Sequence, residues 1–393
     1  MVKRACVVTT TRAEYGLLRP LMQALQMNKS FELQLIVSGT HLSPEFGLTL
    51  NGICEDGFKV NEQIDMLVSG DTPSAVSKSL GLMVLGISDA FRRLTPDFII
   101  ILGDRYEILG VAAAAVLFNI PIVHLHGGEI TEGAVDDSFR HAITKLSHLH
   151  FTSTDVYRKR VIQLGEQPEL VFNVGAIGVD NIRCMKLLSR AELENSLNID
   201  LKIPYFLVTY HPATVTEGDL VSEVDALILS LLDVPDTQVI ITLANADVGG
   251  RTINQRFEYW AKLHVTKIHT FASLGQLRYL SAIKHSLGVV GNSSSGILEA
   301  PSLGVGTLNI GSRQDGRIQA LSVVNSANNK EDIVVGLHRL LSKEHCNLLT
   351  TVKNPYGNGY AVNKIMQVLI NVSFDKLNKK IFYDQNLINV ASE

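Results

Sequence analysis

Residues 98–129, FIIILGDRYEILGVAAAAVLFNIPIVHLHGGE, contain the pattern that decides the fold. Two short apolar runs, Phe98–Leu102 and Ile122–Leu125, lie on either side of a helix-length segment, and a polar, Gly-containing turn follows each run. Runs this short and this continuously apolar are typical of strands that are buried on both faces of a parallel sheet. The stretch therefore predicts a strand–helix–strand unit.

The same pattern recurs along the chain and predicts an α/β fold with two Rossmann-like, doubly wound parallel sheets. Further apolar runs occupy residues 5–8, 33–37, 171–174, 206–208, 239–243, 287–290 and 307–310. Helix candidates occupy residues 17–27, 75–94, 221–232 and 361–372. The pattern pauses at residues 175–204, and 393 residues suit two domains of roughly 100–200 residues each. We therefore expect an N-terminal domain at 1–180, a C-terminal domain at 181–365 and a C-terminal segment at 366–393.

Composition and charge exclude several classes of protein. Hydrophobic residues make up 46% of the chain, which is enough for two buried cores, and the net charge of −4 argues against a nucleic-acid partner. The 4 cysteines form no CxxC pair, so neither a zinc site nor a disulfide framework is expected. No apolar run is long enough for a signal peptide or a membrane span, and we expect a cytoplasmic protein with no membrane partner.

Charged side chains follow the apolar runs of the first half, where open α/β sheets bind their ligands. Arg12 comes after the first run and before a helix candidate, which suits an anion, although it could simply solvate the helix start. Asp104 and Arg105 follow residues 98–102 directly. The segment HLHGGEITEGAVDDSFRH then adds His126, Glu129 and Asp136. We expect either Asp136 or its neighbour Asp137 to cap a helix that begins near Ser138, and the other to face the ligand.

The second half carries a candidate phosphate site. His211 follows residues 206–208 and precedes a proline, and GNSSSG at residues 291–296 joins a strand to a helix. Consecutive backbone N–H groups and serine hydroxyls in such a turn hold a pyrophosphate without a metal ion. Glu299 could accept hydrogen bonds from ribose hydroxyls, and Arg313 lies in the following GSRQDGR segment. The chain has neither GxGxxG nor GxxxxGK[ST], so no nicotinamide or Walker-type ATP site is indicated.

Seven motifs occur in one order: TRAEYG, GDRYE, HGGE, DDSFRHAITKLSHLH, YHP, GNSSSG and GSRQ.GR. In this combination the chain resembles the UDP-N-acetylglucosamine 2-epimerases, and among them the hydrolysing branch that supplies sialic-acid synthesis. The resemblance implies a GT-B-like arrangement of two Rossmann-like domains with an interdomain cleft. It also implies a C-terminal helix that returns to the first domain, a homodimer or homotetramer, and no metal or other cofactor.

The resemblance also implies roles for individual residues. UDP would be held mainly by the second domain, through Ser293, Ser294, Glu299, His211, Asn245, Arg313, Phe271 and Ser273. Arg12 and Arg105 would approach the phosphates from the first domain, and Asp104 and Asp136 match acidic positions that the family uses in catalysis. Many members have HIEGGE where this chain has HLHGGE, so His126 replaces an acidic residue. A histidine can transfer a proton near neutral pH, and Glu129 could supply the carboxylate instead.

The implied reaction converts UDP-N-acetylglucosamine and water to N-acetylmannosamine and UDP. UDP leaves C1 as the C2 proton is removed, giving 2-acetamidoglucal, and water then adds at C1 while C2 is reprotonated on the opposite face. Asp104 would serve the elimination, and Asp136 with His126 or Glu129 the hydration. Four alternatives stay open: a hydrolysing UDP-N,N′-diacetylbacillosamine 2-epimerase of legionaminic acid synthesis, a non-hydrolysing epimerase, a GT-B glycosyltransferase that uses a UDP-sugar, and a non-catalytic UDP-sugar sensor.

Overall fold

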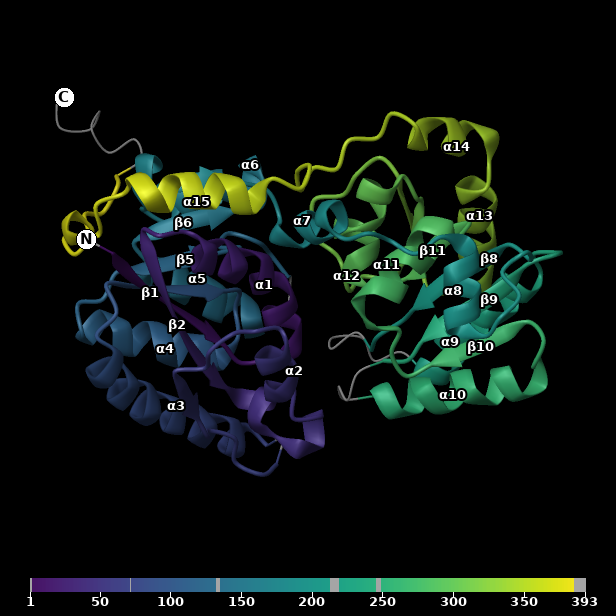
Figure 1. Ribbon diagram of the computed structural model, residues 1–393. Helices are drawn as coiled ribbons and strands as arrows, with labels where there is room; N and C mark the ends of the chain where they lie inside the picture. Colours follow the sequence, from purple (N-terminus) through teal and green to yellow (C-terminus); the bar gives the residue numbers. More distant parts are fainter. Residues whose placement is uncertain (1, 71, 132–134, 213–218, 245–248, 385–393) are drawn as a thin grey trace, which may run out of the picture. The chain divides into compact units, whose positions relative to one another are not determined.

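The chain folds into two compact units (Figure 1). The computed structural model describes residues 2–70, 72–131, 135–212, 219–244 and 249–384. The first unit consists of Met1–Ile130, Ala134–Asp180 and Gly359–Glu393, and the second of Thr131–Gly133 and Asn181–Asn358. Residues from Gly359 onward therefore belong to the first unit, whereas the sequence pattern placed residues up to 365 in the second domain.

The first unit is built on a seven-stranded parallel sheet with the order β3-β2-β1-β4-β5-β6-β7. The strands are β1 (Lys3–Thr9), β2 (Phe31–Ser38), β3 (Glu62–Ile64), β4 (Phe98–Leu102), β5 (Ile122–Leu125), β6 (Leu149–Thr152) and β7 (Val171–Asn173). The helices are α1 (Arg12–Met27), α2 (Leu50–Glu55), α3 (Pro73–Leu94), α4 (Tyr106–Leu117), α5 (Val135–Leu146), α6 (Asp155–Gln163) and α15 (Ala361–Asn371). Side chains of α1 and α15 share one buried cluster with the sheet, and side chains of α3 and α4 share another.

The helix α15 is fixed to the first unit at its first turn. The buried Asp180 carboxylate accepts hydrogen bonds from the backbone N–H groups of Ala361 at 2.9 Å and Val362 at 2.8 Å. Ile365 and Leu369 of α15 are buried in the same cluster as the side chains of α1, so the apolar face of α15 is covered. An acceptor at the N-terminus and an apolar face together explain why this segment joins the first unit.

The second unit repeats the architecture with a six-stranded parallel sheet, in the order β10-β9-β8-β11-β12-β13. The strands are β8 (Tyr205–Thr209), β9 (Gln238–Thr242), β10 (Ile268–Phe271), β11 (Gly288–Gly291), β12 (Thr307–Ile310) and β13 (Val323–Ser326). The helices are α8 (Arg190–Leu197), α9 (Leu220–Leu232), α10 (Gly250–Leu263), α11 (Gly275–His285), α12 (Ser294–Leu298), α13 (Lys330–Leu340) and α14 (Lys343–Leu349). The short helix α7 (Ile177–Cys184) contains the boundary between the units.

These two sheets confirm the predicted α/β class with two Rossmann-like, parallel-sheet domains. Chain order changes direction between β1 and β4 in the first sheet and between β8 and β11 in the second. In doubly wound sheets, the loops at the carboxyl ends of strands beside such a point form the ligand site. Within the described ranges, no helix combines the length and the apolar character needed to cross a membrane.

Candidate functional site

Arg140 connects the acidic residues at the carboxyl edge of the first sheet. Its guanidinium, only 3% exposed, forms an ion pair with Asp104 in the loop after β4. It also donates to Asp137 Oδ1 at 2.7 Å and to the backbone oxygen of Glu129 at 2.8 Å. One buried cation thus gathers the loops after β4 and β5 and the first turn of α5, which places Asp104 and Glu129 in one site.

Asp136 and Asp137 have different surroundings, although they are adjacent in α5. Asp137 pairs with Arg140, whereas the pKa of Asp136 is raised by partial burial and by the nearby charge of Asp104. Their helix begins at Val135, so both lie in its first turn. The expectation that one of them caps a helix beginning near Ser138 is therefore wrong.

His126 and Glu129 form a hydrogen-bonded pair after β5. His126 has a left-handed backbone conformation with φ of 65°, and its Nδ1 lies 3.1 Å from Glu129 Oε1. The backbone N–H of Ile177 donates to its Nε2 at 3.4 Å, so Nδ1 carries the proton of the neutral ring and donates to Glu129. Ser153 Oγ donates to the same carboxylate oxygen at 2.8 Å. The predicted pair is thus brought together, with its tautomer set by the backbone.

The two predicted arginines of the first unit occupy helix N-termini. Arg12 is exposed and is the first residue of α1, whose start is fixed by a capping box between Thr11 and Glu14. Arg105 is the N-cap residue of α4, and its Nε donates to the Glu107 carboxylate at 2.5 Å. Burial opposes the charge of Arg105, but Glu107 raises its pKa, so the guanidinium stays protonated. Both positions suit an anionic ligand.

Asn292 organises the predicted residues of the second unit. Its side-chain oxygen accepts from the His211 backbone N–H at 2.7 Å, and its amide donates to the His211 carbonyl at 2.8 Å. Its own backbone oxygen accepts from Arg313 Nη1 at 2.9 Å. A single buried amide therefore joins the loops after β8, β11 and β12 and brings His211 and Arg313 together.

Close backbone contact between β11 and β8 shapes the start of the serine turn. Gly291 has φ of 131°, and a Cβ there would lie 2.1 Å from the Thr209 backbone oxygen. Only glycine tolerates this conformation and this approach. The chain can consequently turn from β11 into Asn292 and the N-terminus of α12.

Ser293 and Ser294 begin the short helix α12. Ser293 is the N-cap and its Oγ accepts from the Ser295 N–H at 3.4 Å. Ser295 Oγ lies 2.9 Å from Ser293 Oγ and 2.5 Å from the hydroxyl of Tyr279. These contacts fix the serine hydroxyls at the helix start, where backbone N–H groups and hydroxyls favour an anion.

Glu299 follows α12 as its C-cap residue. Burial raises the pKa of its carboxyl group to about 7. No hydrogen bond from another described residue reaches this carboxylate, in contrast to those of Asp104 and Glu129 in the first unit. A desolvated acceptor of this kind is suited to the hydroxyl groups of a ligand.

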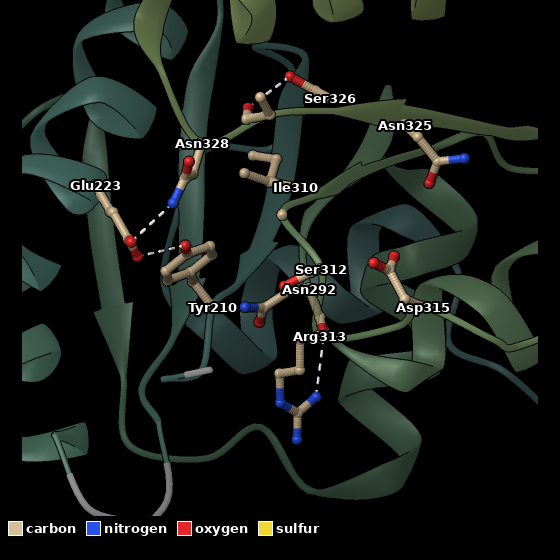
Figure 2. Close-up of a pocket in the computed structure, with 12 residues that line it drawn as sticks. Tyr210, Glu223, Asn292, Ile310, Ser312, Arg313, Asp315, Asn325, Ser326 and Asn328 are labelled. Atoms are coloured by element: carbon tan, nitrogen blue, oxygen red, sulfur yellow. Dashed lines mark hydrogen bonds between the residues drawn. The ribbon is translucent and has the colours of Figure 1, made fainter. Parts of the chain in front are cut away.

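A cavity of about 490 Å³ adjoins Arg313 at the carboxyl edge of the second sheet. In Figure 2, Tyr210 and Asn328 both turn toward the Glu223 carboxylate, to which they donate at 2.8 and 2.7 Å, and Arg313 lies beside Asn292. Tyr210, Glu223 and Asn328 were not predicted from the sequence as site residues. A signal was available for Tyr210 and Asn328, because each lies shortly after an apolar strand.

The remaining predicted residues lie near the start of α11. Phe271 ends β10, and Ser273 is exposed in the loop that follows, where its Oγ accepts from the Gly275 N–H at 3.2 Å. No described contact links either residue to the Asn292 group. Asn245 lies outside the described residues. Arg140 and Asn292, which organise the two groups, were quoted within motifs but were not predicted as site residues.

Comparisons with known proteins identify the family of the chain. The family model described as UDP-N-acetylglucosamine 2-epimerase matches residues 23–370. The chain is 42% identical to a Campylobacter jejuni protein named "GDP/UDP-N,N'-diacetylbacillosamine 2-epimerase (hydrolyzing)", over 97% of this chain and 99% of the relative. It is 37% identical to the Escherichia coli "Polysialic acid biosynthesis protein P7", over 98% of each.

The fold is also found in solved structures. A Neisseria meningitidis UDP-GlcNAc 2-epimerase bound to UDP-GlcNAc gives a TM-score of 0.79 at 16% identity, covering 94% of this chain and 100% of that one. This likeness shows that the two Rossmann-like domains are of the GT-B-like type. Because the family model and both relatives span most of the sequence, the chain belongs to the UDP-N-acetylglucosamine 2-epimerase family.

Proposed function

We propose that the protein is a hydrolysing 2-epimerase of a UDP-linked 2-acetamido sugar, which releases UDP and the C2 epimer of the sugar. The observation that carries the proposal is the group of acids that Arg140 gathers after β4 and β5, on a chain from this family. The name of the Campylobacter relative, which specifies a hydrolysing enzyme, supports the hydrolytic outcome.

We assign UDP mainly to the second unit. Ser293, Ser294, His211 and Arg313 would bind the diphosphate, because hydroxyl, imidazole and guanidinium donors can neutralise its charge as it leaves. The desolvated Glu299 would accept from the ribose hydroxyls. Phe271, Ser273 and Asn245 would contact the nucleotide, and Arg12 and Arg105 of the first unit would complete the phosphate site.

We assign the proton transfers to the first unit. Asp104 removes the C2 proton as the C1–O bond to UDP breaks, and the electron pair forms the C1–C2 double bond of 2-acetamidoglucal. Water then adds at C1 and a proton is delivered to C2 on the opposite face. The raised pKa of Asp136 suits that proton donor, and the His126–Glu129 pair would orient the water.

Two substrates fit this reaction. The sequence motifs suggested UDP-N-acetylglucosamine as the substrate. Its product would be N-acetylmannosamine, and the pathway would be sialic acid synthesis. The higher identity to the diacetylbacillosamine enzyme, 42% against 37%, favours UDP-N,N′-diacetylbacillosamine as the first candidate. UDP-N-acetylglucosamine remains the second candidate, supported by the polysialic acid relative.

Parallel incubations with the two nucleotide sugars in D₂O test the proposal, with NMR of the products. We expect free UDP and a free sugar of inverted C2 configuration that carries deuterium at C2, with one nucleotide sugar consumed much faster than the other. An intact UDP-linked epimer would instead indicate the non-hydrolysing reaction. Transfer of the sugar to an added acceptor with retention of its C2 hydrogen would indicate a glycosyltransferase.

A further inference from the structure

Glu107 supports Arg105 from the interior of the first unit. It lies in the first turn of α4, and 2% of its side chain is exposed, against 41% for Arg105. The Arg105 Nε donates to its Oε1 at 2.5 Å, whereas the terminal nitrogens of Arg105 have no partner among the described residues. The inner edge of the guanidinium is thus fixed and its terminal nitrogens are available, and a pair of such nitrogens matches the oxygens of a phosphate.

A second buried carboxylate, Glu14 of α1, interacts electrostatically with both Arg105 and Glu107. Its Oε2 accepts from the backbone N–H and the hydroxyl of Thr10, at 2.9 and 2.7 Å, and from the Thr11 N–H at 3.2 Å. Glu14 is therefore fixed to the turn that precedes Arg12, and its charge acts on Arg105 and Glu107.

Each of these carboxylates has one oxygen that lacks a hydrogen-bond partner. Glu14 Oε1 and Glu107 Oε2 are buried, and neither has a partner in the part of the chain that the structure describes. Burial disfavours the ionised form of a carboxyl group, and so does a negative charge nearby. Burial, followed by the charge of Glu107, raises the pKa of Glu14 to about 7.

The charge of this group depends on a proton on Glu14. With a proton on Glu14, the charge of Glu107 balances Arg105, and without it the three side chains carry one net negative charge. Tyr106 of α4 and Asp136 of α5 also interact with Arg105 or Glu107, and Asp104 and Arg140 act on Asp136. A second negative charge beneath Arg105 would oppose an incoming anion.

We propose that Glu107 is a positioning residue for Arg105, and that the buried Glu14 carries a proton when the protein binds its anionic ligand. This inference rests on the proposed function, in which Arg105 contacts the diphosphate of UDP. It adds two residues that touch neither the nucleotide nor the sugar but set the orientation and the effective charge of a group that does.

Substitutions of Glu107 test the positioning role by UDP calorimetry at pH 7. Glu107→Met keeps the length of the side chain without an acceptor, and we expect the Kd for UDP to rise about 10- to 100-fold, as for loss of a charged hydrogen bond. Glu107→Gln retains an acceptor and should restore much of the affinity. Glu62→Met is the matched control, because Glu62 binds Arg93 through two hydrogen bonds of 2.7 and 2.8 Å in the same unit and has no assigned role.

The pH dependence of Glu14→Gln tests the proton on Glu14. UDP itself titrates near pH 6–7, so the quantity to compare is the ratio of the wild-type Kd to the variant Kd. We expect the ratio to be smallest at pH 6 and to rise about 3- to 10-fold by pH 8.5, where wild-type Glu14 is ionised beneath Arg105. In ¹³C-labelled protein, a glutamate carboxyl resonance should titrate near neutral pH and be absent from Glu14→Gln.

The outcomes separate this inference from the proposed function. If the wild type does not bind UDP, the proposed function fails, whereas the carboxyl titration still reports on the proton. If the wild type binds UDP and a folded Glu107→Met binds it equally well, the positioning role is wrong. A Kd ratio for Glu14→Gln that stays constant from pH 6 to 8.5, with no carboxyl titrating near neutrality, overturns the protonation of Glu14.

Discussion

At the scale of single residues, acidic side chains that the sequence alone does not distinguish have different hydrogen-bond partners in the fold. Asp104 is paired with the buried Arg140, Glu129 accepts hydrogen bonds from His126 and Ser153, and Glu299 has no donor among the described residues. The sequence located Asp104 and Glu129 because they follow apolar runs, and Glu299 because it lies one turn into the helix after the GNSSSG turn. It did not reveal their partners, because Arg140 and Asn292 act through contacts that only the fold creates.

Asp104→Asn should separate chemistry from binding. We expect turnover to fall at least about 100-fold, because a carboxylate base is lost, while UDP binds with little change. Turnover is measured as UDP release and binding by calorimetry. Asp97→Asn is the control, since Asp97 forms an exposed ion pair with Arg4 at 3.1 Å, outside the site. Near-wild-type turnover in Asp104→Asn would remove Asp104 from the mechanism.

Glu299→Gln should change the dependence of stability on pH. The carboxyl pKa of about 7 lies above its ordinary value of 4.5, so its contribution to stability is full below pH 4.5 and is lost as the pH rises through 7. The variant, which cannot ionise, should therefore gain about 1–3 kcal/mol over the wild type between pH 5 and pH 8. Urea unfolding at both pH values measures this, and equal pH dependence of the two proteins would contradict it.

The same substitution should weaken UDP binding. An amide accepts a hydrogen bond less strongly than a carboxylate, so we expect the Kd for UDP to rise about 10-fold at pH 8. Calorimetry with UDP and with uracil provides the comparison, because only UDP carries the ribose. Unchanged UDP affinity would exclude contact between Glu299 and the ribose hydroxyls.

At the scale of elements, strands with continuous apolar runs could be predicted and mixed strands could not. All the predicted runs lie in or overlap strands. Polar residues interrupt the strands that were missed, which are β3 (Glu62–Ile64), β6 (Leu149–Thr152), β10 (Ile268–Phe271) and β13 (Val323–Ser326). The buried His150 in β6 is paired with a residue outside its strand, because its Nε2 lies 3.0 Å from Oε2 of Glu166 in the loop after α6. The helix α1 begins at Arg12 instead of residue 17, because the Thr11–Glu14 capping box precedes its first apolar residues.

Gly291→Ala should disrupt the turn between β11 and α12. A methyl group 2.1 Å from the Thr209 oxygen, at φ of 131°, requires the strands to separate. We expect a loss of at least about 2 kcal/mol in the free energy of unfolding, together with weaker UDP binding. Gly16→Ala is the control, because a Cβ there meets nothing within 4 Å in α1, and it should stabilise the protein by about 1 kcal/mol.

At the scale of the whole molecule, the first unit is assembled from separate parts of the chain. Residues 359–393 belong with residues 1–130 and 134–180, and residues 181–358 of the second unit are encoded between these parts. The sequence pattern indicated two Rossmann-like halves, but it placed the end of the second at 365. The Asp180 hydrogen bonds that hold α15 on the first unit join residues 181 and 182 positions apart in the sequence.

Asp180→Ala should release the start of α15. Two backbone N–H groups would lose a buried charged acceptor, and we expect unfolding of the first unit to become easier by about 2–4 kcal/mol. Hydrogen exchange read by mass spectrometry should show faster exchange in α15 and in the α1 surface beneath it. Asp375→Ala, an exposed site in the same segment, should leave these rates unchanged.

This discontinuity has a consequence for synthesis on the ribosome. Translation at roughly 5–20 residues per second leaves roughly 10–40 s between the completion of Asp180 and the emergence of α15. During that interval the apolar side chains of α1 and of the neighbouring strands lack α15, which packs in the same cluster in the finished protein. A nascent chain at this stage exposes apolar side chains that a chaperone can cover. Residues 181–358, which are encoded without interruption, can already fold during this time.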